Sequence, residues 1–421
     1  HQAAEGDVQY RTVVSDMRAR HESALDACSS GLSDDEQNRL REAQEAVFEE
    51  LSGILHGVEL VHECSPRTRD ILLSFGERLS VRIVAAALRA AGVPARDVDA
   101  RHHVRTDDRH GRAMVEVEPS YAAIRAMYHA SSEVPVFTGF IASTGAGVTT
   151  TLGRNGSDYS ASLVGAALQA EVIEIWTDVD GVFSADPRFV SDSFVVDEIS
   201  YQEAMELSYF GAEVIHPATM TPATESGVPL RIRNTLNPSA PGTWIQDGAA
   251  DSGRAITGIA SIEHAALINV EGSGMIGIPG IASRIFSALA EASVNVIMIS
   301  QASSEHSICV VCRLAEVEAA IASLNRELAE EIQGRRIEAP QVQRNLEIVA
   351  VIGRRMRGRP GIAGELFHAL GKAGVNILAI AQGSSEMNIS FVVSGSQREL
   401  TLNTVHKAFF DESEGHYEVC Q

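Results

Sequence analysis

The chain has 421 residues, which predicts two to four domains at about 150 residues each. Its formal net charge is −22 and its only lysines are Lys372 and Lys407. We therefore exclude non-specific binding to nucleic acid and docking on an anionic membrane, since both need dense positive charge. The composition, with 45% hydrophobic and 21% charged residues, also excludes a disordered chain. No apolar run could cross a membrane, the start does not read as a signal peptide, and five scattered cysteines are typical of reduced thiols in the cytoplasm.

Residues 8–60 are predicted to be helical. Ser33 is followed by three acidic residues, as at many helix N-termini, and apolar residues then recur at helical spacing from Leu40 to Leu55. A second apolar helix is expected at 78–91, after a glycine turn that carries Glu77 and Arg78. Glu77 could accept an ammonium group there, or could only interact with the helix dipole.

From residue 70 to 245 the pattern alternates between strands and helices. We expect strands near 134–141, 171–176 and 228–233, with a helix at 158–169. This alternation predicts an α/β domain with a mostly parallel sheet and helices on both faces. A polar stretch of small residues at 236–255 is the best domain boundary, so we predict a first domain over 1–249.

Beyond this boundary the sequence repeats itself with an offset of 81 residues, so that Pro279 matches Pro360 and Phe286 matches Phe367. Each copy reads as strand, PGI turn, helix, strand, QxSSE turn and strand. Two ferredoxin-like βαββαβ modules are predicted, module 1 over 250–340 and module 2 over 341–421. They are expected to pack on each other or on a second copy of the chain. The last strand, GHYEVCQ, could complete module 2 or cross into module 1.

Cys309 and Cys312 have CxxC spacing inside SICVVCRL, which reads as a strand. Residues three apart on a strand point to opposite faces. We therefore interpret them as two ordinary buried cysteines rather than a redox or metal pair.

The densest segment runs over 137–188. Gly153, Gly156 and Ser157 lead into a helix that is expected to start near Asp158, where free backbone amides favour an anion. Ser157 or Asp158 could equally be a helix cap, and spacing alone does not separate these readings. Arg154 in the same turn suits a carboxylate or a phosphate.

The strand VIEIW runs into TDVDGV, which places Thr177, Asp178 and Asp180 at the carboxyl end of a parallel strand. Ligands of α/β proteins bind at such ends, and a carboxylate there could hold magnesium or a ribose hydroxyl. A ligand-free Asp-Gly turn is an equal alternative. Arg188 could reach a phosphate. The sequence contains no Walker A motif, no GxSxG and no cluster with metal-ligand spacing, so we predict no resident metal.

Four long motifs carry a family resemblance: TTTLGRNGSDYSA, EIWTDVDGVFSADPR, EISYQEAMELSYFGAEVIHPAT and RNTLNPSAPGTWI. They resemble the aspartokinase branch of the amino-acid kinase family, and the repeated modules resemble ACT domains. QASSEHSI and AQGSSEMNISFVV are especially similar to the threonine-regulated aspartokinase half of bifunctional aspartokinase–homoserine dehydrogenases. The resemblance covers nearly the whole chain in order.

The resemblance implies ATP- and Mg²⁺-dependent phosphorylation of the β-carboxylate of L-aspartate, the first step towards threonine, methionine and lysine. It also implies feedback regulation by threonine and a homo-oligomer, a dimer or tetramer, formed through the ACT domains. Glu77 would bind the substrate ammonium and Arg154 its α-carboxylate, with Arg154 and Asp158 as the catalytic residues. The other implied roles are aspartate binding by Gly139, Phe140 and Ser157, nucleotide binding by Thr177, Asp178, Phe183 and Arg188, and effector binding by Asn295, Gln301, Asn376 and Gln382.

Two alternatives stay open. Members of the family begin with a strand carrying KFGGTS, whose lysine binds phosphate, and this sequence opens after that point. Either residues upstream of His1 supply that lysine, or the protein is a non-catalytic amino-acid-binding regulator of the same fold. A third reading, a kinase for another acid such as glutamate, is disfavoured by the GRNGSDY and SFGER motifs.

Overall fold

The computed structural model describes residues 1–421 except 212–214, 249–252, 276–277, 302–305 and 412–421. The chain divides into two compact units, which are described separately. Unit 1 comprises His1–Ile175 and Ala218–Leu230, and unit 2 comprises Trp176–Pro217 and Arg231–Gln421.

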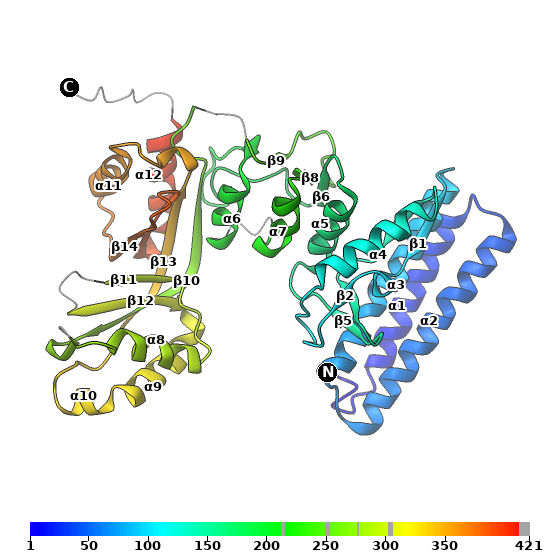
Figure 1. The fold of residues 1–421 in the computed structure, drawn as a ribbon, viewed down its shortest axis with the longest axis horizontal. Helices are drawn as coiled ribbons and strands as arrows, with labels where there is room; N and C mark the ends of the chain where they lie inside the picture. Colours follow the sequence, from blue (N-terminus) through cyan, green and yellow to red (C-terminus); the bar gives the residue numbers. More distant parts are fainter. Residues whose placement is uncertain (212–214, 249–252, 276–277, 302–305, 412–421) are drawn as a thin grey trace. The chain divides into compact units, whose positions relative to one another are not determined.

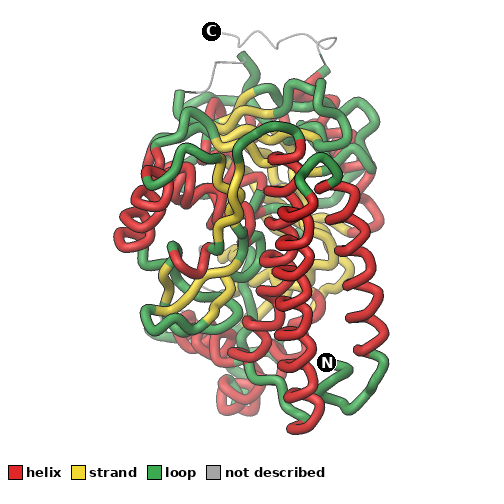
Figure 2. The backbone as a smooth tube through the Cα atoms, turned by 90° about the vertical axis from the view of Figure 1, so that its right-hand side faces the viewer, coloured by secondary structure: helices red, strands yellow, loops and turns green. Residues whose placement is uncertain are grey.

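Unit 1 begins with three helices that run side by side, α1 (Tyr10–Ser29), α2 (Asp34–Val61) and α3 (Pro66–Ala90) (Figures 1 and 2). The predicted cap is confirmed, because Ser33 Oγ accepts a hydrogen bond from Glu36 N at the start of α2. Apolar residues of α2 and α3 form their shared core, among them Phe48, Leu51, Phe75 and Leu79.

The predicted glycine turn before residue 78 is wrong. Helix α3 starts at Pro66 behind the cap Ser65, so Glu77 and Arg78 lie in the middle of a helix. Gly76 sits on the exposed side of α3, where an added Cβ would meet no atom within 4 Å. A glycine costs a helix about 1 kcal/mol, and burial of the neighbouring Phe75 and Leu79 outweighs that cost.

The α/β part of unit 1 contains five short strands. Strand β1 (Ala95–Val98) pairs in parallel with β3 (Val134–Phe137), and β2 (Arg105–Thr106) pairs in parallel with β4 (Ile141–Thr144). Strand β5 (Thr149–Thr151) is antiparallel to β4. Helices α4 (Val117–His129) and α5 (Gly156–Leu168) pack on these strands through a core that includes Ile124, Ile141 and Leu163.

A further sheet has the strand order β6 (Ile173–Thr177), β8 (Leu230–Asn234), β9 (Thr243–Ile245) and β7 (Glu198–Ile199). Helix α6 (Tyr201–Tyr209) begins with a capping box formed by Ser200 and Glu203, and α7 covers Pro217–Ser226. Short 3₁₀ turns lie at Ala100–His102, Ser273–Met275, Leu314–Glu316, Arg354–Met356 and Gly395–Gln397. The predicted α/β class is confirmed, with its described strands divided among three sheets.

The repeat forms one six-stranded sheet in the order β11-β12-β10-β13-β15-β14, and every neighbouring pair is antiparallel. Module 1 contains β10 (Gly258–Glu271), α8 (Ile281–Glu291), β11 (Met298–Gln301), β12 (Ser307–Arg313), α9 (Val317–Glu327) and α10 (Ala329–Gln333). Module 2 contains β13 (Gln341–Ile352), α11 (Ile362–Lys372), β14 (Ala379–Gln382), β15 (Asn388–Ser394) and α12 (Arg398–Phe410). Each module has its own helix-covered core.

Strands β10 and β13 are long enough to serve both modules. Residues Gly258–Ile262 of β10 pair with the half of β13 that also pairs with β15. In return, Gln341 and its neighbours in β13 pair with the half of β10 that also pairs with β12. Among the described residues, the three strands of each module are therefore extended by one half of the first strand of the other module. The segment GHYEVCQ lies outside the described residues.

Of the two cysteines of the CxxC spacing, both predicted to be buried, Cys312 is buried and Cys309 is only partly buried. Cys312 is buried in the core of module 1, and this burial raises its pKa to about 11. Cys309 instead places its Sγ 3.2 Å from Asn269 Oδ1 on β10. The two side chains thus have separate surroundings, as expected for opposite faces of a strand.

Candidate functional site

Glu77, Gly139 and Ser157, to which the resemblance assigns aspartate binding, lie close together in unit 1. Gly139 N, between β3 and β4, donates a hydrogen bond to Glu77 Oε2 over 3.2 Å. A Cβ added at Gly139 would lie 3.0 Å from Ser157 Cα, Cβ and Oγ. Only glycine lets these backbones approach so closely. Helix α3, the β3–β4 turn and the start of α5 therefore meet at one place.

Phe140 joins the same place through its backbone. Its φ is +63°, its N donates to Ser160 Oγ over 3.0 Å, and its carbonyl accepts from Leu152 N over 2.9 Å. Ser160 donates in turn to Gly156 O. Ser160 was missed by sequence analysis, although its spacing of four residues from Gly156 on a helix was visible.

Helix α5 begins at Gly156 rather than near Asp158. Its N-cap is Asn155, whose φ is +54° and whose side chain makes no capping bond. The alternative that Ser157 or Asp158 caps the helix is therefore wrong. Ser157 and Arg154 are exposed at this helix start, and Asp158 lies half-buried in the first turn. The Gly156 amide donates to Gly153 O over 3.2 Å. The amides of Ser157 and Asp158 lie in the first turn, where N–H groups have no intrahelical partner, so they favour an anion here.

Burial raises the pKa values of two carboxyl groups in this cluster, Glu77 and Asp158. The Gly139 amide partly opposes the shift at Glu77, and the Asn155 side chain partly opposes it at Asp158. Burial penalises an ionised carboxylate, and a bound ammonium group would remove that penalty. The cluster thus combines carboxylates suited to a cation with a helix start and an arginine suited to an anion.

We expect Glu77→Gln to stabilise the protein at pH 8 more than at pH 4. Because the folded-state pKa of Glu77 is raised, the stability that the protonated form contributes is lost as the pH rises through that pKa. Glutamine carries no charge at any pH and can still accept from Gly139 N. Thermal melts at both pH values, with exposed Glu63→Gln as control, check this. Equal shifts at the two pH values would contradict it.

Asp70 holds a buried network beside this cluster that sequence analysis missed. Its carboxylate, 1% exposed, accepts from Thr151 Oγ1 and pairs with His110 Nδ1, both over 2.7 Å. It also accepts from Gly111 N over 3.1 Å. A Cβ added at Gly153 would lie 3.2 Å from Gly111 O, so the network supports the turn before Arg154. The network joins three separate stretches of the sequence, at Asp70, at His110 with Gly111, and at Thr151, and no motif marks them.

The predicted nucleotide residues belong to unit 2. Thr177 ends β6, and its Oγ1 donates to Asp178 Oδ1 over 3.2 Å. Asp178 is exposed, while Asp180 Oδ1 accepts from Asn234 Nδ2 and Asn237 Nδ2 over 2.8 and 3.1 Å. The two asparagines belong to the motif RNTLNPSAPGTWI, so part of this motif fixes the turn after β6.

Phe183 and Arg188 follow on the segment after β6. Phe183 forms an antiparallel bridge with Val195. The Arg188 guanidinium pairs with Asp186 over 2.6 Å and its side chain is 72% exposed. An exposed arginine can exchange such a neighbour for a phosphate at small cost, because exposed ion pairs are weak.

The four predicted effector residues occupy equivalent exposed places in the two modules. Asn295 and Asn376 precede β11 and β14, and Gln301 and Gln382 are the last residues of these strands. Although β11 and β14 are the outer strands of the sheet order, they come close to each other.

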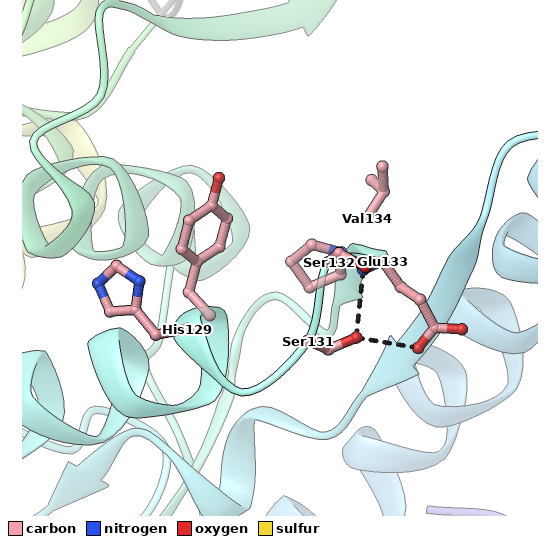
Figure 3. A pocket seen from close by; sticks show the side chains of 7 residues that line it. His129, Ser131, Ser132, Glu133 and Val134 are labelled. Carbon is pink, nitrogen blue, oxygen red and sulfur yellow. Dashed lines mark hydrogen bonds between the residues drawn. The ribbon is translucent and has the colours of Figure 1, made fainter.

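One pocket among the described residues lies apart from the predicted site residues. A pocket lies at the end of α4 and is lined by Tyr128, His129, Ser131, Ser132, Glu133, Val134 and Pro135 (Figure 3). It contains none of the predicted site residues. Among the described residues, no cluster of three metal-ligating side chains is present, and no helix is long and apolar enough to span a membrane.

Two known family models match successive parts of the chain. The model of the amino acid kinase family matches residues 11–234, and that of the ACT domain matches 268–328 and 349–409. The chain belongs to the amino acid kinase family.

Its relatives place it in the aspartokinase branch with ACT domains. It is 38% identical to the chloroplastic bifunctional aspartokinase/homoserine dehydrogenase 1 of Arabidopsis thaliana, covering 97% of this chain and 45% of that protein. Crystal structures of E. coli aspartokinase III, with aspartate and ADP and with lysine and aspartate, are 29% and 30% identical with TM-scores of 0.72 and 0.71. Both cover 93% of this chain and 91% of theirs. The chain spans about half the length of the curated bifunctional relatives that it matches.

Proposed function

We propose that the protein is an aspartate kinase that transfers the γ-phosphoryl group of ATP to the β-carboxylate of L-aspartate, giving 4-phospho-L-aspartate and ADP. The contact of Glu77 with Gly139, beside Ser157 at the start of α5, carries this proposal. It brings a carboxylate suited to an ammonium group close to a helix start suited to an anion. The aspartokinase relatives, one of them solved with aspartate and ADP, support it.

The proposed roles follow the chemistry of each group. Glu77 binds the ammonium of aspartate, and Arg154 binds its α-carboxylate in bidentate fashion. The backbone turn at Gly139 and Phe140, together with Ser157, orients the substrate. Asp158 in the first turn of α5 completes the pocket. On the nucleotide side, Thr177, Asp178, Phe183 and Arg188 contact ATP.

Mg²⁺ is proposed to enter with ATP. It commonly binds through substrate phosphates and one or two carboxylates, without an all-protein cage. An exposed carboxylate such as Asp178 at the end of β6, with no cluster of three ligands among the described residues, fits that mode. When bound, the ion neutralises charge on the transferred phosphoryl group.

An assay on the full-length gene product tests the catalytic proposal. We expect ADP release that depends on both L-aspartate and Mg²⁺, with L-glutamate as the control substrate. Binding of aspartate without turnover would support the non-catalytic alternative, and turnover of glutamate in preference to aspartate would support a different amino-acid kinase.

Regulation by threonine is the second part of the proposal. We infer that Asn295, Gln301, Asn376 and Gln382 bind the effector, and that the ACT modules join copies of the chain into a dimer or tetramer. The domain bounds 1–249, 250–340 and 341–421 also remain part of the proposal, and the first boundary lies at residues outside those described.

We expect threonine to raise the melting temperature by preferential binding to the folded state. At 100 times its dissociation constant, a ligand adds about 2.7 kcal/mol to the free energy of unfolding. Gln301→Ala combined with Gln382→Ala is expected to remove the shift. Lysine, which is bound in one E. coli aspartokinase III structure, is the competing effector. A shift with lysine and none with threonine would refute the assignment.

A further inference from the structure

Residues 183–196 form a segment that carries two of the proposed nucleotide contacts, Phe183 and Arg188. Its two ends are held together by backbone hydrogen bonds, from Ser184 N to Phe194 O and from Val196 N to Val182 O, each 2.8 Å long. The conformation of the residues between these two ends therefore depends on their contacts with the rest of the protein.

One buried anchor joins this segment to helix α12 of module 2. Ser184 Oγ shares a hydrogen bond of 3.0 Å with His406 Nε2. Ser184 is 0% and His406 5% exposed. The same hydroxyl accepts from Phe194 N over 3.1 Å, and the Phe194 and His406 rings meet edge to face. Ser184 thus connects both ends of the segment to one histidine of the ACT module.

A second anchor lies at Phe189, next to Arg188. Asn403 Nδ2 on α12 donates to Phe189 O over 2.8 Å, and the Arg398 guanidinium lies 3.8 Å from the centroid of the Phe189 ring. Ala185 and Val190 are buried in the same hydrophobic core as Leu402 and Val405 of α12. The segment is therefore part of the packing of module 2.

We propose that His406 and Asn403 are positioning residues for the nucleotide site. They act through Ser184 and Phe189, each adjacent in sequence to a proposed ATP contact, so module 2 sets the geometry with which Phe183 and Arg188 meet ATP. This inference rests on the proposed function, because it takes these two residues as nucleotide contacts. It assigns α12 a role in ATP binding that is independent of any effector.

The test uses the full-length protein with Asn403→Ala and His406→Leu, which remove the two anchors separately. We expect each to raise the KM for ATP about tenfold while the KM for aspartate stays within about twofold, because Phe183 and Arg188 lose a contact that holds them in position for ATP. His406→Gln, whose amide can still bond Ser184, is expected to restore most of the ATP affinity. Lys407→Ala, exposed on the same helix, is the matched control.

Hydrogen–deuterium exchange supplies a readout that does not need turnover. Peptides covering 183–196 should exchange faster in Asn403→Ala and His406→Leu, and at the wild-type rate in Lys407→Ala. Faster exchange with unchanged ATP affinity by calorimetry would overturn the inference and leave a purely structural contact. Equal increases in both KM values, or no change in exchange, would overturn it too. A wild-type protein that binds ATP without turnover would instead refute the proposed function, and calorimetry would still decide the inference.

Discussion

Replacing Arg154 with alanine is expected to raise the KM for aspartate by about 100-fold. A hydrogen bond to a charged group contributes about 1.5–3 kcal/mol, and a bidentate arginine–carboxylate pair is among the stronger of these. Every 1.4 kcal/mol is a factor of about ten in affinity. Arg154 is exposed in the turn before α5, so little loss of folding stability should accompany the loss of binding. Steady-state kinetics with varied aspartate at saturating ATP measure the effect.

Arg154→Lys separates charge from geometry. Lysine keeps the positive charge but cannot form two parallel hydrogen bonds to a carboxylate, so we expect a KM between those of the wild type and the alanine variant. Arg109→Ala is the control, because Arg109 is an exposed arginine that pairs with Asp107. A tenfold rise in the KM for ATP with no change for aspartate would show that Arg154 serves the nucleotide instead.

Asp70→Ala is expected to lower the free energy of unfolding by about 3–5 kcal/mol, as removal of one partner from a buried pair typically does. The carboxylate accepts hydrogen bonds from Thr151 and Gly111 and pairs with His110, and alanine would leave these groups buried without it. Urea unfolding followed by circular dichroism measures the change.

The matched control is Asp35→Ala, at an exposed acidic position in the first turn of α2. It should cost well under 1 kcal/mol. Since the Asp70 network supports the turn that carries Arg154, we also expect the aspartate KM of the Asp70 variant to rise at temperatures where it stays folded. Equal stabilities of the two variants would show that the network contributes nothing to folding.

Much of the fold followed from local sequence patterns. Ser33 with its acidic successors caps α2 as predicted, and the 81-residue repeat produces equivalent elements, so that α8 covers Ile281–Glu291 and α11 covers Ile362–Lys372. Such features are local or strictly periodic, and a single sequence contains them fully.

The features that were missed depend on tertiary packing. Gly76 led us to predict a turn, but helix α3 continues past it because the neighbouring Phe75 and Leu79 are buried. For the cluster around Gly139, the motifs pointed to the residues but not to the contact between Glu77 on α3 and Gly139 after β3. The Asp70 network joins residues 40 and 81 positions apart, and no spacing rule covers such pairs.

The exchange of strand halves between β10 and β13 has a consequence for how the repeat can change over time. Among the described residues, the sheet of each module is extended by one half of the other module's first strand, so removal of either module would expose a strand edge of the other. The two modules therefore form one structural unit rather than two independent domains. A mutation in one module must therefore preserve the strand half that pairs with the other module, so the two modules are constrained to evolve together.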